Sequence, residues 1–324
     1  LIVGCGTIGG GGLLETNETH ARAANSEKRI NLKACMDKDT IKLKKFSENF
    51  MCEPYSDFSL AIRDNYFDFI SICTPDETHY SIVKKILKSS KPPKIIFLEK
   101  PACETLKEYE ELMNLSKKKS VIILVNHSRR FNSKYKAIKE LILSNQLGTI
   151  IRANAIYYGG WFHNGTHILD TLFFLLNDTV IWKKINQVID KNKLHDPTIE
   201  LNGYFSKSKT NVNIYGIDES FYQLSDFDLW FTNGRIRIED FGNNIIIEKK
   251  IINSIGERVL APFKFKSSLD GRTEMQVAMS LICDYLDNGN FEDLLSVSFD
   301  SIKPLMVSLD QGRELFKKKY ENDT

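Results

Sequence analysis

Three glycines near the start of the chain have the spacing of a dinucleotide-binding turn. Gly4, Gly6 and Gly9 fit the pattern G-x-G-x-x-G directly after an apolar run, residues 1–3. Asp37 ends the next strand-like run, where a carboxylate can accept hydrogen bonds from both hydroxyls of an adenosine ribose and repels a 2′-phosphate. The spacing therefore predicts binding of NAD in preference to NADP. A Walker-type phosphate loop is excluded, because no Gly-Lys-Ser/Thr follows the glycines.

The glycines continue beyond this motif, through residues 9–12. A glycine inside a helix costs about 1 kcal/mol relative to alanine, so this run would make a poor first helical turn. We expect the crossover helix to begin late, with Asn17 as its N-cap and Glu18 in its first turn, and to end near Ser26. Residues 10–16 would then be an insertion at the cofactor pyrophosphate, either a flap that orders when ligand binds or a segment that is disordered without it.

Two histidines later in the chain have the spacing of one helical face. His163 and His167 lie four residues apart, and two imidazoles at this spacing can bind zinc. The sequence has no H-E-x-x-H motif and no obvious third ligand, so we expect no metal. A metal hydrolase that uses both histidines is kept as a hypothesis, which bound zinc would support.

The elements that would position these residues alternate between strand-like and helix-like runs over the first 125 residues. This alternation is typical of an α/β fold, a parallel sheet with crossover helices. The expected strands cover residues 1–3, 30–36, 67–73, 94–98 and 121–125. Ligands bind at the carboxyl ends of strands in such sheets. Four residues at these ends could face a ligand: Gly4, Asp37, Thr74 and Glu99.

After about residue 148 the pattern changes to β-rich runs with short turns, which predicts one largely antiparallel sheet. The expected strands cover residues 149–158, 198–205, 210–215, 222–231, 234–238 and 244–251, and two helices follow at 273–286 and 301–318. We therefore predict a dinucleotide-binding Rossmann domain over residues 1–125 and an α+β domain for substrate binding and oligomerisation over residues 126–324. Helices on only one face of the second sheet would leave an apolar patch on the other, which predicts a homodimer or homotetramer.

Composition limits the functional classes. The 324 residues suit two domains, and 42% hydrophobic with 27% charged residues indicates a globular protein. The net charge of +2 argues against a nucleic-acid partner, and no apolar run approaches the ~20 residues of a membrane helix. The six cysteines form no C-x-x-C pair, which is typical of the reducing cytoplasm, where we expect the protein to lie. The chain starts inside an apolar strand at Leu1, so we expect further residues before it, with a leader peptide as an open alternative.

Five further segments carry motifs: THARA (19–23), SICTPDETHYSIVKKIL (71–87), IIFLEKPACETLKE (95–108), VNHSRRFNSKYKAIKELILSNQLGTI (125–150) and NGTHILD (164–170). Together they make the chain resemble the Gfo/Idh/MocA family of nicotinamide-dependent sugar oxidoreductases. In order, they match the start of its first crossover helix, its Thr-Pro turn with a His-headed helix, its Glu-Lys-Pro signature, its stretch leading into the second domain, and its Gly-x-His-x-x-Asp helix. The resemblance covers most of the chain.

The resemblance implies an NAD-dependent oxidoreductase that transfers hydride at a ring carbon of a sugar or sugar nucleotide. Such chemistry needs one group to hold the carbinol oxygen and one to exchange its proton. By family position, Lys100 polarises or deprotonates the hydroxyl and His167 completes the proton transfer. The bond between Lys100 and Pro101 is expected to be cis, as it typically is in the family. His163 stands where family members often carry Asp, so it could tune His167, contact substrate or be a neutral replacement.

The resemblance also implies the binding residues. Substrate contacts are expected from Arg129, Asn126, Asn164 and Asp170. The alternative for Arg129 is an interdomain salt bridge, and the alternatives for Asp170 are to orient His167 or to serve only in packing. The expected cofactor residues are Gly4, Gly6, Thr7, Ile8, Gly9, Asp37, Thr74, Pro75, His79, Glu99 and Lys100.

A second functional hypothesis is a non-catalytic dinucleotide-binding regulator of the same fold, because the family contains members that resemble galactose-regulon repressors. The intact Lys100 and His167 favour the enzyme. The substitution at His163 and the enlarged glycine loop are compatible with the regulator.

Overall fold

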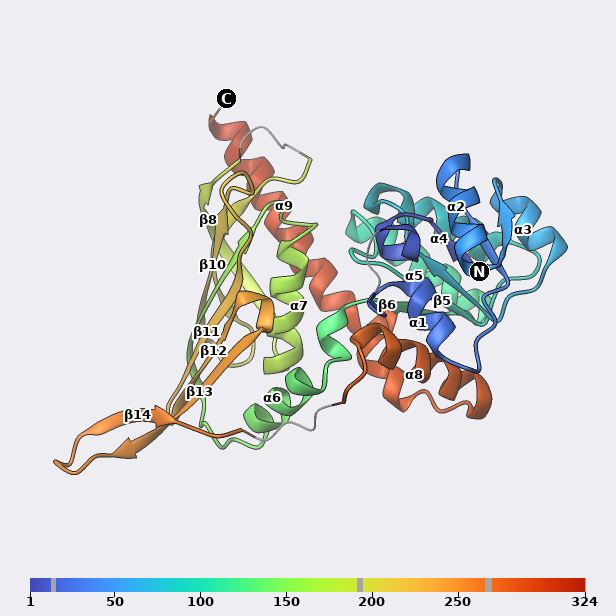
Figure 1. Ribbon diagram of the computed structural model, residues 1–324. Helices are drawn as coiled ribbons and strands as arrows, with labels where there is room; N and C mark the ends of the chain where they lie inside the picture. The colour runs from blue at the N-terminus through green and yellow to red at the C-terminus, as the bar shows by residue number, and fades with distance from the viewer. Residues whose placement is uncertain (13–15, 191–194, 266–269, 324) are drawn as a thin grey trace. The chain divides into compact units, whose positions relative to one another are not determined.

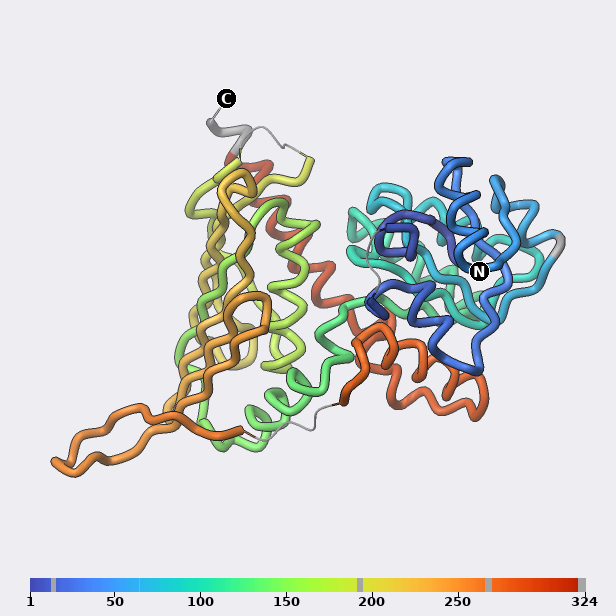
Figure 2. Tube along the Cα trace, in the orientation of Figure 1, coloured from blue at the N-terminus to red at the C-terminus, as the bar shows by residue number. Residues whose placement is uncertain are grey.

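The computed structural model describes residues 1–12, 16–190, 195–265 and 270–323 (Figure 1). The chain divides into two compact units. The first contains Leu1–Asn132 and Asp270–Lys303, and the second contains Ser133–Leu269 and Pro304–Thr324. The chain thus leaves the first unit a few residues after the expected boundary and later returns to it, as the tube in Figure 2 shows.

A six-stranded sheet forms the centre of the first unit. Its strands, in sheet order, are β3 (Glu53–Tyr55), β2 (Ala34–Met36), β1 (Ile2–Val3), β4 (Phe69–Ile72), β5 (Ile95–Leu98) and β6 (Ile122–Val125). All neighbouring strands pair in parallel. The predicted Rossmann sheet is therefore confirmed, with β1 at its centre. Of the six strands, β3 is the one that the sequence did not predict, because its Glu and Pro are poor strand formers.

Helices surround this sheet. They are α1 (His20–Ser26), α2 (Thr40–Phe50), α3 (Phe58–Asp64), α4 (His79–Lys88), α5 (Leu106–Lys119) and α8 (Glu274–Asn288). The last of these comes from the C-terminal part of the chain, where Thr273 and Gln276 form a capping box at its start. Buried Ala23 and Ala24 of α1 share one core cluster with Met279 and Ile282 of α8. Helix α8 therefore completes the first unit.

The glycine run does not enter α1. Thr7–Gly11 form a separate helical turn, in which two amides donate to the carbonyl oxygen of Gly6 over 3.1 and 2.9 Å. The predicted late start of α1 is confirmed, but its N-cap is Thr19 and the expectation of Asn17 is wrong by two residues. Residues 13–15 of the expected insertion lie outside the described residues.

The second unit contains an eight-stranded sheet. Its strands, in sheet order, are β14 (Arg258–Pro262), β13 (Asn244–Ile252), β12 (Gly234–Glu239), β11 (Ser225–Phe231), β7 (Ile150–Tyr158), β10 (Asn211–Ile217), β9 (Ile199–Phe205) and β8 (Val180–Val188). Only the pair of β7 and β10 is parallel, so the prediction of a largely antiparallel sheet is confirmed. The two edge strands, β8 and β14, were not predicted from the sequence.

Three helices cover one face of this sheet: α6 (Ser133–Leu143), α7 (Gly165–Leu176) and α9 (Lys303–Asp323) (Figure 1). Buried tryptophans tie the layers together. Trp161 Nε1 donates to the carbonyl of Leu309 in α9, and Trp182 Nε1 of β8 donates to that of Ser308, both over 3.0 Å. Ten of the twelve residues of α7 are buried, which fixes this helix firmly between its neighbours.

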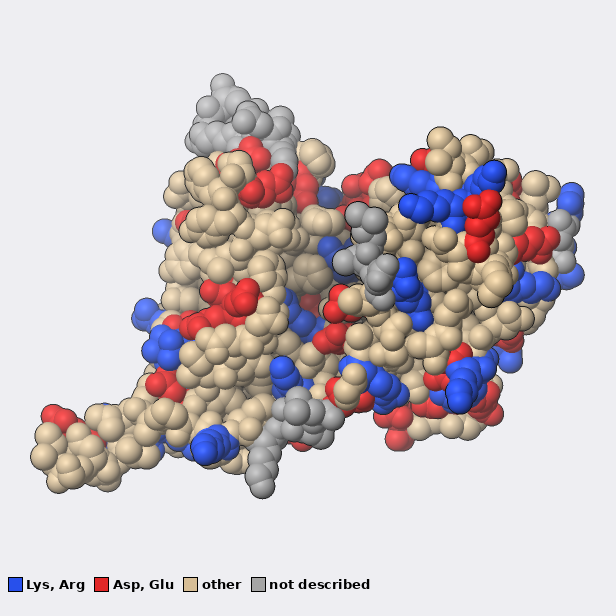
Figure 3. Space-filling view, viewed as in Figure 1, with Lys and Arg blue, Asp and Glu red and all other residues tan. Residues whose placement is uncertain are grey.

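Strands β7, β9 and β10 carry a polar ladder in which Asn202 donates to Asn213 and Asn213 donates to Asn154 (2.8 and 3.1 Å). Arg235 and Asp228 add an ion pair on β12 and β11. The expected apolar patch is therefore interrupted at these positions, and the homo-oligomer stays a prediction. Charges of both signs are interspersed on the visible surface (Figure 3). No helix of the described residues is long and apolar enough to cross a membrane.

Candidate functional site

A cavity of ≈ 780 Å³ lies at the carboxyl ends of β1, β2 and β4 in the first unit. This is the edge at which open α/β sheets bind ligands, and the volume lies in the range of small-molecule sites. Seven residues of the expected cofactor set line it: Gly4, Gly6, Thr7, Ile8, Asp37, Thr74 and Pro75.

The three motif glycines have different reasons to be glycine. Gly4 has φ +100°, and a Cβ on it would lie 2.6 Å from the carbonyl oxygen of Cys73. A Cβ on Gly9 would lie 2.1 Å from the carbonyl oxygen of Gly4. At Gly6 a Cβ would meet nothing within 4 Å, and this residue lines the cavity. The first and third glycines thus allow close backbone packing, and the second keeps space free where a pyrophosphate can approach the backbone, as a dinucleotide requires.

Asp37 is fixed at the end of β2 by two backbone amides. Its Oδ2 accepts from the N–H of Cys5 (2.7 Å) and its Oδ1 from that of Asp39 (2.9 Å). Each oxygen keeps acceptor capacity for a ribose hydroxyl. Three cavity-lining lysines that the sequence analysis did not identify add positive charge opposite an anionic ligand: Lys38, Lys42 and Lys85. The last comes from α4, so only folding brings it to the site.

Lys100 follows the carboxyl end of β5. Its peptide bond to Pro101 is cis, which confirms that expectation, and its side chain is half-buried. The preceding Glu99 is 8% exposed, and its Oε1 accepts from His20 Nε2 (2.8 Å) and Asn126 Nδ2 (2.6 Å). Burial alone would raise the pKa of Glu99, but these two hydrogen bonds and the charge of Lys100 leave the pKa below its usual value.

Glu99 and Asn126 therefore face each other. The expected cofactor contact of Glu99 and the expected substrate contact of Asn126 stay predictions. His20 is the residue that the sequence analysis did not single out here, although its THARA segment was noted. A histidine at the start of a crossover helix is a weak signal, because only the tertiary structure brings it to β5.

His79, the first residue of α4, is completely buried. Its Nδ1 contacts the carbonyl oxygen of Pro101 (2.7 Å) and its Nε2 that of Thr74 (2.8 Å). It thus joins the turn after β4, which lines the cavity, to the turn that follows Lys100.

The two arginines after β6 have different surroundings. Arg130 is buried and its guanidinium donates to the carbonyl oxygen of Ser296 and to Ser301 Oγ, so it is a structural tie within the first unit. Arg129 is half-buried. Of the pair, Arg129 is therefore the better candidate for a ligand contact.

The remaining expected residues lie at the start of α7 in the second unit. His163 is exposed, Asn164 and His167 are half-buried, and Asp170 is buried one turn further on. His167 lies in the first turn of the helix, where its N–H donates to the carbonyl of Asn164 (3.0 Å). The helix thus presents an imidazole and an amide near its N-terminal end.

Asp196, which the sequence analysis did not single out, holds the loop before α7. Its carboxylate accepts from the N–H of Phe162 (2.6 Å) and of His163 (3.1 Å). A Cβ on Gly160 would lie 1.9 Å from Asp196 Oδ2, so only glycine fits there without displacing the carboxylate. Burial raises the pKa of Asp196 above its usual value, although the two amides and the nearby His163 and His195 oppose the increase.

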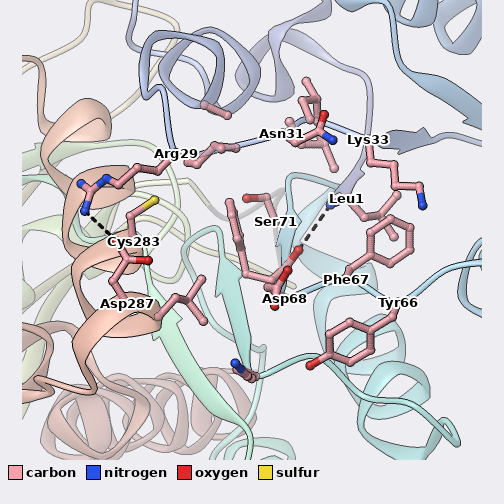
Figure 4. Close-up of a pocket in the computed structure, with 17 residues that line it drawn as sticks. Leu1, Arg29, Asn31, Lys33, Tyr66, Phe67, Asp68, Ser71, Cys283 and Asp287 are labelled. Carbon is pink, nitrogen blue, oxygen red and sulfur yellow. Dashed lines mark hydrogen bonds and ion pairs between the residues drawn. The ribbon is translucent and has the colours of Figure 1, made fainter.

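A second cavity of ≈ 370 Å³ lies at the amino ends of the parallel strands, beside Leu1, Asp68 and Lys94 (Figure 4). On its α8 side, Arg29 pairs with Asp284 and Asp287. This is the edge opposite to the one where such sheets bind cofactors, so the larger cavity is the candidate site. Among the described residues, no group of three or more His, Cys, Asp and Glu side chains could hold a metal ion.

Comparisons with known proteins agree with this fold. Residues 1–127 match the model of an oxidoreductase family, GFO_IDH_MocA, with an NAD-binding Rossmann fold. An inositol 2-dehydrogenase of Rubrobacter xylanophilus is 27% identical over 167 residues, which are 50% of this chain and 43% of that protein. The chain spans about two fifths or less of the length of other curated relatives that it matches, 40%, 26% and 38%.

Solved structures extend the likeness to nearly the whole chain. One is a putative NADPH-dependent oxidoreductase from Desulfitobacterium hafniense, with a TM-score of 0.80, 15% identity and coverage of 98% of this chain and 95% of that one. Another is an oxidoreductase from Agrobacterium radiobacter in complex with NAD⁺, L-tartaric acid and magnesium, with a TM-score of 0.70, 16% identity and coverage of 95% and 93%. At these identities the likeness shows the fold alone.

Proposed function

Because the chain belongs to the Gfo/Idh/MocA oxidoreductase family, through the NAD(P)-binding Rossmann fold of residues 1–127, we propose that it is an oxidoreductase that uses NAD. Its substrate is a ring carbinol or ketone of a sugar or sugar nucleotide. The observation that carries the proposal is the cavity at the carboxyl ends of β1, β2 and β4, whose glycine floor and fixed Asp37 suit a dinucleotide.

The preference for NAD is supported by Asp37, whose carboxylate suits free ribose hydroxyls and repels a 2′-phosphate. Lys38 also lines the cavity, and a comparison of the affinities for NAD⁺ and NADP⁺ tests the preference. Gly6 leaves room for the pyrophosphate, while Thr74 and Pro75 line the same cavity.

When bound, the nicotinamide accepts or donates the hydride. In the proposed mechanism Lys100 acts on the carbinol hydroxyl in one of two ways: as an ammonium it polarises the oxygen by donating a hydrogen bond, or as an amine it takes up the hydroxyl proton. His167 completes the proton transfer. Asn164 and Arg129 bind substrate, and His163 contacts substrate or tunes His167.

The test is turnover with NAD⁺ or NADP⁺ and a panel of polyols, sugars and UDP-sugars, measured by nicotinamide absorbance. General acid–base groups contribute about 10² to 10⁴ in rate, so Lys100→Met should lower kcat at least a hundredfold. NAD⁺ affinity, measured by calorimetry, should change less than threefold. Lys94→Met is the matched control, because Lys94 lies at the other end of β5 and outside the larger cavity.

Parallel loss of turnover and NAD⁺ affinity in Lys100→Met would assign the lysine a structural role and contradict the mechanism. Tight NAD⁺ binding by the wild type without turnover of any compound would instead favour the non-catalytic regulator. Light scattering at micromolar concentration tests the proposed homodimer or homotetramer, and a monomer would refute it.

A further inference from the structure

Buried histidines hold the residues on both sides of Lys100. On one side His20 is bonded to Glu99, and on the other His79 is bonded to Pro101. We propose that His20 and His79 form a two-sided clamp that positions the Lys100 ammonium. The clamp rests on the proposed function only for the role of Lys100 in proton transfer. Its contacts themselves all lie within the first unit.

The first side of the clamp fixes the residue before the lysine. Both His20 Nε2 and Asn126 Nδ2 converge on Glu99 Oε1, over 2.8 and 2.6 Å. His20 is completely buried and its ring lies 4.9 Å from that of Phe97, so packing fixes the imidazole as well. A buried carboxylate with two donors on one oxygen has little freedom to rotate, which fixes the backbone from which Lys100 departs.

The second side fixes the residue after the lysine. His79 meets carbonyl oxygens at both ring nitrogens, those of Pro101 and Thr74. The imidazole ring therefore lies between two carbonyl oxygens that belong to different turns. Because Thr74 lines the larger cavity, this side ties the position of Lys100 to the wall of the cofactor site.

The sheet alone does not fix the lysine. Strand β5 ends at Leu98, and the next ladder bond runs from the N–H of Glu99 to the carbonyl of Ile72 (3.0 Å). Beyond it, the two histidine contacts flank Lys100, one to Glu99 before it and one to Pro101 after it. Two buried polar atoms of the first side, His20 Nδ1 and Asn126 Oδ1, have no partner among the described residues. Asn126 Oδ1 can still accept a hydrogen bond and His20 Nδ1 can still take part in one.

The test measures the reactivity of Lys100 directly, without substrate or cofactor. The full-length protein is labelled with a trace of acetic anhydride, and mass spectrometry gives the labelling rate of Lys100 relative to exposed Lys94. In the wild type we expect the clamped, half-buried Lys100 to be labelled at least fivefold more slowly than Lys94. His20→Leu and His79→Leu should bring the ratio to within twofold of 1, because the lysine is then free to move into solvent.

Conservative variants separate positioning from folding. The amide of His20→Gln can replace Nε2 as the donor to Glu99 and should restore the wild-type ratio. His79→Asn replaces the contact to Pro101 and His79→Gln the contact to Thr74, and we expect Asn to restore the ratio more fully. Tyr109→Phe is the control, since it removes another buried bond in the first unit, from its hydroxyl to the carbonyl of Phe299 (2.8 Å), and should leave the ratio unchanged.

The outcomes for the clamp and for the proposed function are distinct. The clamp would be overturned by a wild-type labelling ratio near 1, or by a ratio that stays the same in both leucine variants and in their amide counterparts. The proposed function would still stand if turnover were sensitive to Lys100→Met. A ratio that responds as expected in a protein without turnover would keep the clamp and refute the oxidoreductase. In an active protein, the leucine variants should lower kcat at least tenfold and alter KM less than threefold, because a misplaced proton acceptor affects the transition state more than binding.

Discussion

Replacing Asp196 by alanine should loosen the loop that begins the α7 helix. The substitution removes the acceptor of two backbone amides, those of Phe162 and His163. A hydrogen bond to a charged group contributes about 1.5–3 kcal/mol, but burial of this carboxylate offsets part of that, as its raised pKa indicates. We therefore expect a loss of about 2–4 kcal/mol in the free energy of unfolding, which for a unit of this size is a decrease in Tm of roughly 5–10 °C.

Gly160 gives this prediction an internal check. Because a Cβ at Gly160 would lie 1.9 Å from Asp196 Oδ2, Gly160→Ala must displace the carboxylate and lose the same two bonds. The two substitutions should therefore not add. In the Asp196→Ala background, Gly160→Ala should cost less than about 1 kcal/mol, which gives a coupling energy above roughly 1 kcal/mol.

Thermal and urea unfolding of the two single variants and the double variant measure this cycle. Asp196→Asn belongs in the same series, since it keeps an acceptor oxygen and avoids the cost of burying a charge, and should be the least destabilised. Additive losses, or an Asp196→Ala variant as stable as the wild type, would show that the carboxylate does not hold the loop. Turnover should fall in parallel, because the loop leads into Asn164 and His167.

Two further predictions concern the first unit. Gly6→Ala should leave the Tm within about 1 °C of the wild type and weaken NAD⁺ binding at least tenfold, because its Cβ would project into the cavity. Gly271→Ala, where a Cβ is equally free of contacts, should change neither quantity, and unchanged NAD⁺ affinity in Gly6→Ala would place the pyrophosphate elsewhere. Glu99 has a lowered pKa in the folded protein, so its contribution to stability is present above the ordinary value of 4.5 and is lost as the pH falls through the folded-state pKa. Unfolding midpoints measured from pH 6 to pH 3 should therefore fall more steeply for the wild type than for Glu99→Gln, and identical slopes would mean that the carboxylate is not stabilised in the fold.

Local patterns in the sequence were sufficient for the fold class. Apolar runs of strand length, separated by helix-like runs, predicted five of the six strands of the first sheet. The β-rich runs predicted the second sheet. The short strand β3 and the edge strands β8 and β14 were missed, because edge strands bury fewer residues and so carry a weaker apolar pattern. The N-cap of α1 was misplaced because capping preference alone favours Asn17, whereas the helix begins after the buried Thr19, whose side chain makes no capping hydrogen bond.

The sequence by itself determined most of the elements, the glycine turn, and the positions of Asp37 and Lys100 at strand ends, because these depend on residue type and short-range spacing. Only the tertiary structure decided that His20 meets Glu99, 79 residues away, that His79 joins Thr74 to Pro101, and that Asp196 holds the loop before α7. Apart from Thr74, which lies five residues before His79, these contacts join residues 22 to 79 positions apart. No local pattern encodes such a pair, since its geometry depends on how whole helices and strands pack.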